Sequence, residues 1–183
     1  MKEILFIILK LPVLMSTILY GGVSYASGQL MAIGVDNKFT YSEKTNSYEW
    51  LEPGNDSVLF YDLENPGFPK FIGSVAVENS IIGPPTNIAI TPDQRLGLIA
   101  NAVSTEPDEF TASGYKMKPS NFISVVDLSL RPIRVIDRVV VGTMPSGISI
   151  DKVGKFGVVA NRKDSTVSIL SINGPSVVDT ALA

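Results

Sequence analysis

The chain has 183 residues, with 15 Lys and Arg against 18 Asp and Glu, and it contains neither Cys nor His. Thiol nucleophiles, imidazole bases, disulfides and Cys or His metal ligands are therefore excluded. Apolar residues make up 45% and charged residues 18%, which is the composition of a globular domain and not of a disordered chain. At this length a single domain with a sizeable core is expected.

The first 26 residues are predicted to be a secretory signal peptide. The apolar run at 11–23 is shorter than the ~20 residues that span a membrane comfortably. Ser24 and Ala26 place small residues where a signal peptidase reads the chain, so cleavage is expected after Ala26. Export to the periplasm or the medium follows, and the alternative is an uncleaved membrane anchor formed by residues 4–23.

The net charge of the chain limits the kinds of binding partner that are expected. Loss of the first 26 residues removes Lys2, Lys10 and Glu3, which leaves 13 positive and 17 negative side chains and a net charge of −4. A nucleic acid partner is not expected at this charge. Contact with a membrane is expected only through the signal segment, if that segment stays uncleaved.

An internal repeat is the clearest signal in the sequence. Residues 85–101 align with residues 145–161 at a constant offset of 60 and without a gap. Six of these 17 positions are identical: Pro85 and Pro145, Ile88 and Ile148, Ile90 and Ile150, Gly97 and Gly157, Ala100 and Ala160, Asn101 and Asn161. Repetition at this level predicts a repeat architecture.

Short runs rich in Val and Ile, bounded by Gly, Pro, Asn and Asp, predict strands and not helices. Eleven strands are expected, at 29–35, 58–63, 71–77, 87–91, 97–102, 122–128, 134–141, 147–151, 157–161, 166–172 and 176–182. The first of them aligns with residues 97–103 and is expected to be the second strand of its unit. A loop insertion is expected at 102–121, which leaves a basic unit of about 42 residues and four strands.

Four antiparallel strands repeated at this spacing are typical of a β-propeller blade. The predicted fold is all-β, a partial β-propeller of about two and three-quarter blades at 29–77, 84–141 and 142–183. Neighbouring blades should pack face to face. The first strand of a blade is its inner strand, so Ile88, Ile90, Ile148 and Ile150 are expected on inner strands.

These residues resemble the YVTN-type β-propeller repeat family of exported bacterial and archaeal proteins. The resemblance rests on the lead-in at 142–147, on strands that end at Asn101 and Asn161, and on the third strand at 123–127. Gln94 and Ser171 depart from the family pattern. The resemblance implies a relative of seven-bladed lactonase-like and quinoprotein-like propellers, so that residues 27–183 form an incomplete propeller and a fragment of a longer chain.

The acidic run of Glu106, Asp108 and Glu109 offers hard oxygen ligands for Ca²⁺, but it lacks the spaced alternation of a calcium loop. A solvated loop tip is the favoured interpretation. Trp50, with Tyr48, could form a sugar-stacking or partner surface, or could simply cover a long loop.

Other polar positions have a structural interpretation. Arg162 is expected in an exposed turn, where it could join a ligand or partner surface. Asn101 and Asn161 recur at one blade position and are expected to satisfy turn backbone groups.

Three functional hypotheses follow. The first and favoured one is a non-enzymatic binding or scaffold module for a protein, glycan or other cell-envelope component. The second is a fragment of a propeller enzyme or redox subunit, although no catalytic, cofactor-binding or metal residue can be named and no cofactor is expected. The third is a degenerate remnant without function. Uncovered blade faces should also prevent the chain from behaving as a stable monomer.

Overall fold

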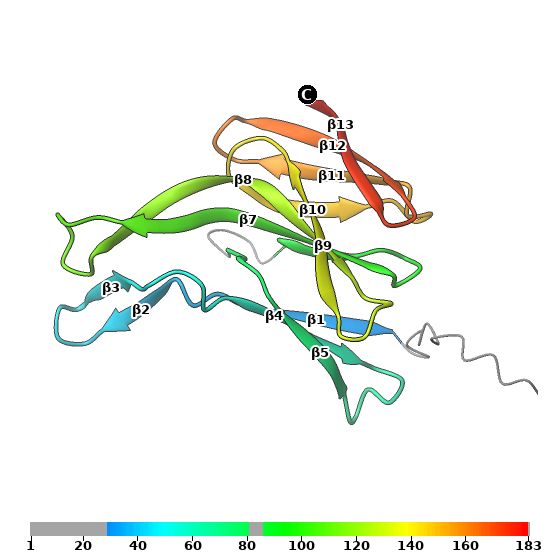
Figure 1. Ribbon diagram of the computed structural model, residues 1–183, viewed down its shortest axis with the longest axis horizontal. Helices are drawn as coiled ribbons and strands as arrows, with labels where there is room; N and C mark the ends of the chain where they lie inside the picture. The colour runs from blue at the N-terminus through cyan, green and yellow to red at the C-terminus, as the bar shows by residue number, and fades with distance from the viewer. Residues whose placement is uncertain (1–28, 81–85, 183) are drawn as a thin grey trace, which may run out of the picture.

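The computed structural model describes residues 29–80 and 86–182, and within these ranges it contains thirteen strands and no helix (Figure 1). The first sheet has the order β1 (Leu30–Val35), β4 (Ser57–Asp62), β5 (Lys70–Ala76). The second has the order β6 (Ile88–Ile90), β7 (Leu96–Pro107), β8 (Tyr115–Asp127), β9 (Arg134–Val140). The third has the order β10 (Pro145–Ile150), β11 (Phe156–Asn161), β12 (Thr166–Asn173), β13 (Ser176–Leu182). β2 (Phe39–Ser42) and β3 (Ser47–Trp50) form a separate two-stranded hairpin.

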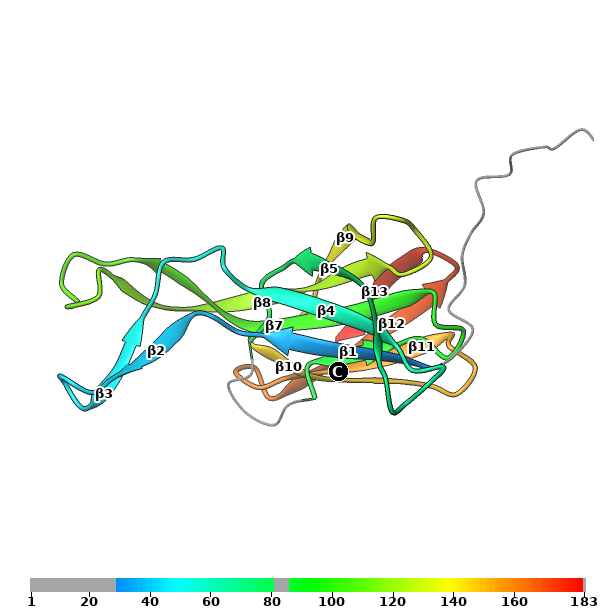
Figure 2. The ribbon, with the colours of Figure 1, turned by 90° about the horizontal axis from the view of Figure 1, so that it is seen from below.

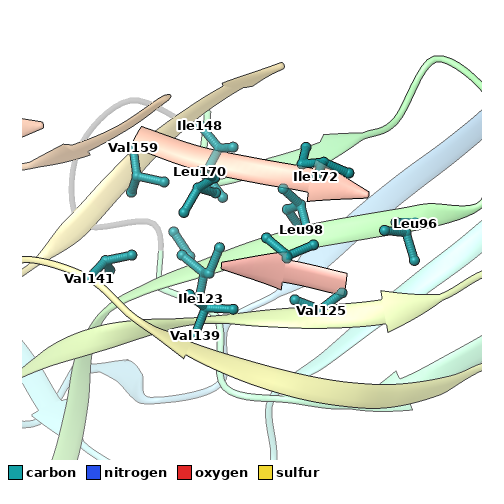
Figure 3. Close-up of a cluster of buried hydrophobic side chains, with 12 residues drawn as sticks. Leu96, Leu98, Ile123, Val125, Val139, Val141, Ile148, Val159, Leu170 and Ile172 are labelled. Atoms are coloured by element: carbon teal, nitrogen blue, oxygen red, sulfur yellow. The ribbon is translucent and has the colours of Figure 1, made fainter. Parts of the chain in front are cut away.

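The three larger sheets stack face to face, with an apolar layer in each of the two spaces between them (Figure 1). The layer between the first and second sheets contains Leu30, Val58, Phe60, Val75, Val77, Ile99, Val126, Leu128 and Ile133. The layer between the second and third sheets contains Leu96, Leu98, Ala100, Ile123, Val125, Val139, Val141, Ile148, Val159, Leu170, Ile172 and Val177 (Figure 3). Alternation along each strand sends successive side chains to opposite layers, so the second sheet is apolar on both faces.

The chain is therefore an all-β partial propeller of antiparallel sheets, as the repeats predict. All strand pairs within the described residues are antiparallel. Ile88 and Ile90 lie on β6, and Ile148 and Ile150 lie on β10, the first strands of their sheets, which confirms the expected inner strands. The predicted signal peptide lies outside the described residues. No helix in the described ranges is long and apolar enough to cross a membrane.

One backbone hydrogen bond marks the same place in each sheet. The carbonyls of Gln29, Arg95 and Lys155 accept at 2.8 Å from the amides of Leu63, Leu128 and Ile172, which lie at or just beyond the ends of β4, β8 and β12. Gln29 is therefore equivalent to Arg95, whereas the sequence alignment set it against Gly97. β1 is a second strand as expected, but the sequence alignment was wrong by two residues. A shift of two keeps every side chain on the same face of the strand, so the apolar pattern does not distinguish the two alignments.

The turn between the first two strands of a sheet requires left-handed backbone. Gly154 takes this conformation with φ of 72°, as its type allows, and Gln94 takes it with φ of 59°. The Gln94 side chain offsets that strain, because its Oε1 accepts from the Leu30 amide at 2.6 Å. Gln94 thereby ties the second sheet to the first.

The expectation of a loop at 102–121 was wrong. β7 and β8 continue through it as a two-stranded ribbon, in which Thr105 pairs with Met117. Alternation of buried Val103 and Thr105 with partly exposed Ser104 carries the strand signal. Pro107, on β7, and Pro119, on β8, are tolerated, because each strand of a two-stranded ribbon has a free edge that needs no N–H donor.

Candidate functional site

Two hairpins project from the same end of the stacked sheets (Figure 2). Both are insertions between the second and third strands of a sheet, so they leave the sheets at the same edge. The aromatic hairpin consists of β2, β3 and their turn, residues 39–50. The charged hairpin consists of the outer parts of β7 and β8, residues 102–121. β3 lies against β8, so the two hairpins are neighbours.

The aromatic hairpin carries four rings on one face. Phe39 pairs with Trp50 and Tyr41 pairs with Tyr48, so all four side chains point the same way. Successive rings meet edge to face, with centroids 5.5 to 5.7 Å apart. Such packing supports a two-stranded ribbon that would be marginal alone. Trp50 is half-buried, whereas Tyr41 is 50% and Tyr48 70% exposed, so the outer rings are open to a ligand.

The charged hairpin carries a small ion-pair network. Lys116 Nζ lies 3.4 Å from Asp108 Oδ2 and 3.5 Å from Glu106 Oε1, and Lys118 Nζ lies 3.5 Å from Glu106 Oε2. The Asp108 carboxylate, followed by that of Glu106, raises the pKa of Lys116 above its usual value. The Lys116 ammonium thus takes the position between two carboxylates that a cation would need. Glu109 lies exposed in the tip of this hairpin.

A buried ion pair closes the base of the aromatic hairpin. Lys38 precedes β2 and Asp56 precedes β4, and both are at least 95% buried. The Lys38 ammonium donates to the Asp56 carboxylate and, at 2.7 Å, to the Asn79 carbonyl. Asp56 also accepts from the backbone amides of Asn37 at 2.9 Å and Asn79 at 3.1 Å. These contacts join the start of the hairpin, its end and the segment after β5 into one clamp.

Asn79 extends this clamp to the first sheet. Its Nδ2 donates to the carbonyls of Val35 and Ser57 at 3.1 Å, which are the last residue of β1 and the first of β4. Its Oδ1 would lie 2.8 Å from a Cβ at position 34, so that position accepts only Gly34 without rearrangement. A cavity of about 150 Å³ opens beside the clamp, lined by Gly54, Asp56, Ala76, Val77, Glu78 and Arg138. This volume is below the range of ordinary cofactor and drug pockets.

The recurrent asparagines have side-chain partners and not the backbone partners that were expected. Asn101 Nδ2 donates to Ser104 Oγ at 3.0 Å and to Glu78 Oε2 at 3.3 Å. Asn161 Nδ2 donates to Thr166 Oγ1 at 3.1 Å and to Ser168 Oγ at 3.2 Å. Both asparagines are at least 99% buried; Asn101 lies where the charged hairpin leaves the second sheet, and Asn161 is the last residue of β11.

The structure brings together only some of the residues singled out in the sequence. Glu106 and Asp108 meet around Lys116 on the charged hairpin. Trp50 lies apart from them on the aromatic hairpin, where its ring contacts that of Phe39. Arg162 lies exposed in the turn after β11, and its amide donates to the Met144 carbonyl at 3.1 Å.

The three residues of the buried clamp carried no sequence signal. Lys38, Asp56 and Asn79 occupy polar stretches between strands, where such residues are ordinarily solvated. The described part of the chain contains no group of three or more Asp or Glu side chains arranged to hold a metal ion.

No family model and no curated protein matches the chain. Solved structures that resemble it include a functionally unknown protein from Desulfotomaculum acetoxidans, with TM-score 0.49, 17% identity and coverage of 79% of this chain and 47% of that one. A periplasmic gluconolactonase from Pseudomonas aeruginosa has TM-score 0.48, 14% identity and coverage of 85% and 39%. This chain spans less than half the length of either protein. At such scores the propeller fold rests on the chain's own sheets.

Proposed function

We propose that this protein is an exported, non-enzymatic binding module of the cell envelope, and that its ligand contacts the aromatic hairpin. The observation that carries the proposal is the row of four rings on one face, with Tyr41 and Tyr48 open to solvent. Exposed tyrosines in an ordered ribbon supply contact area at little entropic cost, and each adds a hydroxyl that can hydrogen-bond. A polymeric cell-envelope glycan fits this surface, since sugars present both apolar C–H faces and hydroxyl groups.

The stacked sheets support this role mechanically. Binding residues are commonly carried on connections that a rigid scaffold holds in place. Here the clamp of Lys38, Asp56 and Asn79 fixes the base of the aromatic hairpin, and contact with β8 supports its side. The rings are therefore presented in one orientation before a ligand arrives, which lowers the cost of binding.

Co-sedimentation with purified peptidoglycan sacculi tests the proposal. We expect the wild-type chain to be retained, and the double variant Tyr41→Ala, Tyr48→Ala to lose roughly tenfold or more in affinity, as loss of two aromatic contacts of about 1 kcal/mol each implies. Phe68→Ala is the matched control, because Phe68 is 81% exposed in the turn between β4 and β5, away from the hairpins. Equal retention of the wild type and the double variant, or no retention of the wild type, would contradict it.

Export and family membership are part of the same proposal. Sequence features at 11–26 support a cleaved signal peptide, and Gly142, Asn101 and Asn161 support membership of the YVTN-type propellers. N-terminal sequencing of the protein from a bacterial periplasm is expected to begin at Ser27. A sequence that begins at Met1 in a membrane fraction would favour an anchor instead.

A further inference from the structure

Equivalent strands of the three sheets carry equivalent side chains toward one neighbour. The shared hydrogen bond after Gln29, Arg95 and Lys155 fixes which residues correspond. On the side that we term the forward face, four of the corresponding positions are Leu30, Ala32, Val58 and Phe60 in the first sheet, Leu96, Leu98, Ile123 and Val125 in the second, and Phe156, Val158, Val167 and Ile169 in the third. All twelve are apolar.

The opposite side, the rear face, repeats in the same manner. Its corresponding positions are Ile33, Tyr61 and Leu63 in the first sheet, Ile99, Val126 and Leu128 in the second, and Val159, Leu170 and Ile172 in the third. These residues are also apolar or aromatic. Neither set contains a charged side chain; at the strand ends the forward face also carries Asp62, opposite Leu30, and Asp127, opposite Leu96.

In both contacts between the large sheets of the described residues, a forward face packs on a rear face. The forward face of the first sheet meets the rear face of the second, and the forward face of the second meets the rear face of the third. The forward and rear residues of the second sheet that are named above are all at most 3% exposed, because a neighbouring sheet covers each face. The same type of contact is thus made twice.

One forward face and one rear face have no partner among the described residues. On the third sheet, Phe156 is 56% and Val158 45% exposed. On the first sheet, Ile33 is 42% exposed and Phe71, which packs on the Tyr61 ring at 5.5 Å, is 52% exposed. Figure 1 shows these sheets as the two outer layers of the stack. Large apolar patches of this kind mark interaction surfaces.

We propose that the free forward face of one copy of this chain packs on the free rear face of a second copy. The contact would be the third instance of one that the chain already makes twice, and a single chain supplies both halves of it. The described residues of two copies contribute six of the larger sheets, and propellers close with about four to eight blades. A head-to-tail pair can therefore close on itself through two identical contacts related by a two-fold axis.

Head-to-tail pairing is preferred over symmetric pairing of like faces for a structural reason. A forward face packed on a forward face, or a rear face on a rear face, is a combination found nowhere in the described chain. The side-chain shapes of the two faces differ, with Phe156 and Val158 on one and Ile33 and Tyr61 on the other. Complementary packing of unlike faces is what the two existing cores demonstrate.

Two single variants test the pairing in the chain as a bacterial host exports and processes it. Val158→Asp blocks the forward face and Ile33→Asp blocks the rear face. Sedimentation velocity over about 1 to 100 µM is expected to give a dimer for the wild type and a monomer for each variant alone. An equimolar mixture of the two variants is expected to restore a dimer, because each variant retains the face that the other has lost. Phe68→Asp, at an exposed turn, is the control that should dimerise as the wild type does.

The same experiment distinguishes the other occupants. A wild type that stays monomeric at every concentration would overturn the proposal and indicate that the faces receive further sheets of a longer polypeptide. A dimer formed by either blocked variant alone would show that like faces pair, and would overturn the head-to-tail arrangement. Circular dichroism melts establish that the variants are folded, and Val158→Lys and Ile33→Lys replace any acidic variant that is not.

Discussion

Gly142 shows how a single position can limit the packing around the buried side chain of Asn161. A Cβ at position 142 would overlap the side-chain amide of Asn161, which is buried between Thr166 and Ser168. The Gly142 amide also donates to Ser168 Oγ at 3.3 Å, so this close approach is part of the same network. Glycine is required here for space, since its backbone does not adopt positive φ.

Gly142→Ala is expected to lower the free energy of unfolding by about 1 to 3 kcal/mol, because Asn161 must leave its partners to make room. Chemical denaturation measures the loss. Gly67→Ala is the control, since a Cβ there meets only the Asn65 side chain at 3.5 Å in an exposed loop, and it should change stability by at most about 0.5 kcal/mol. A Gly142 variant as stable as the control would show that Asn161 is not held in place.

Asp151 gives a prediction about pH. Its carboxylate accepts from the backbone amides of Phe156 at 2.8 Å, Lys155 at 2.7 Å and Val153 at 3.3 Å. The bond from Phe156, the largest cause, lowers the pKa of Asp151 below its usual value of 3.8. The stabilisation is therefore present above about pH 4 and is lost as the pH falls through the lower folded pKa.

Carbon-detected NMR titration should place the Asp151 midpoint below 3.8. Asp151→Asn should lose less stability than the wild type on acidification through the same interval, because the variant has no carboxylate to protonate. A midpoint at or above 3.8 would mean that the turn between β10 and β11 does not hold the ionised form.

At the scale of elements, the aromatic hairpin depends on a contact outside its own strands. Lys38 and Asp56 bracket the hairpin in sequence and meet beneath it, where water does not compete for either charge. Asp36 Oδ1 also lies 3.7 Å from the Lys38 Nζ, so removing Lys38 would take the ammonium from two buried carboxylates. The pair is therefore expected to hold the hairpin to the first sheet.

Lys38→Met is expected to destabilise the fold by about 3 to 5 kcal/mol, because the buried side chains of Asp36 and Asp56 both lose the ammonium that lies beside them. The triple variant Lys38→Met, Asp36→Asn, Asp56→Leu should be destabilised by clearly less than Lys38→Met alone. Thermal and urea unfolding measure both. Lys118→Met is the matched control, because Lys118 forms an exposed pair with Glu106 and its loss should change stability by less than about 1 kcal/mol. Equal effects of the two single variants would contradict the role of the buried clamp.

At the scale of the whole molecule, equivalent positions differ in what covers them. Leu98 is fully buried between the second and third sheets, whereas Val158, at the corresponding position of the third sheet, is 45% exposed. Leu98→Ala should therefore cost about 2 to 5 kcal/mol at any protein concentration. Val158→Ala should cost at most about 0.5 kcal/mol in dilute protein, and more as the concentration rises into the range of the dimer.

Unfolding curves at several concentrations measure this difference. A large cost of Val158→Ala in dilute protein would mean that something within the chain already covers the forward face of the third sheet. A cost that stays small at every concentration would remove the support that this position gives to the head-to-tail pair.

The sequence by itself predicts the strands, because Val- and Ile-rich runs between turn residues are a local signal, and the offset of 60 between residues 85–101 and 145–161 repeats that signal. Face-to-face packing also follows, since the strands of the second sheet are apolar on both faces. The same local signal is weaker at 102–121, where alternation is broken by Pro107 and Pro119, and the continuation of β7 and β8 was missed.

Only the tertiary structure places Lys38 beside Asp56 and Asn79, because residues 18 and 41 positions apart meet through the register of β1 with β4 and the path of the chain after β5. It likewise determines which corresponding residues are covered. Val158 and Leu98 are equivalent in pattern, and their burial differs because burial depends on the neighbouring sheet and not on the strand that carries the side chain.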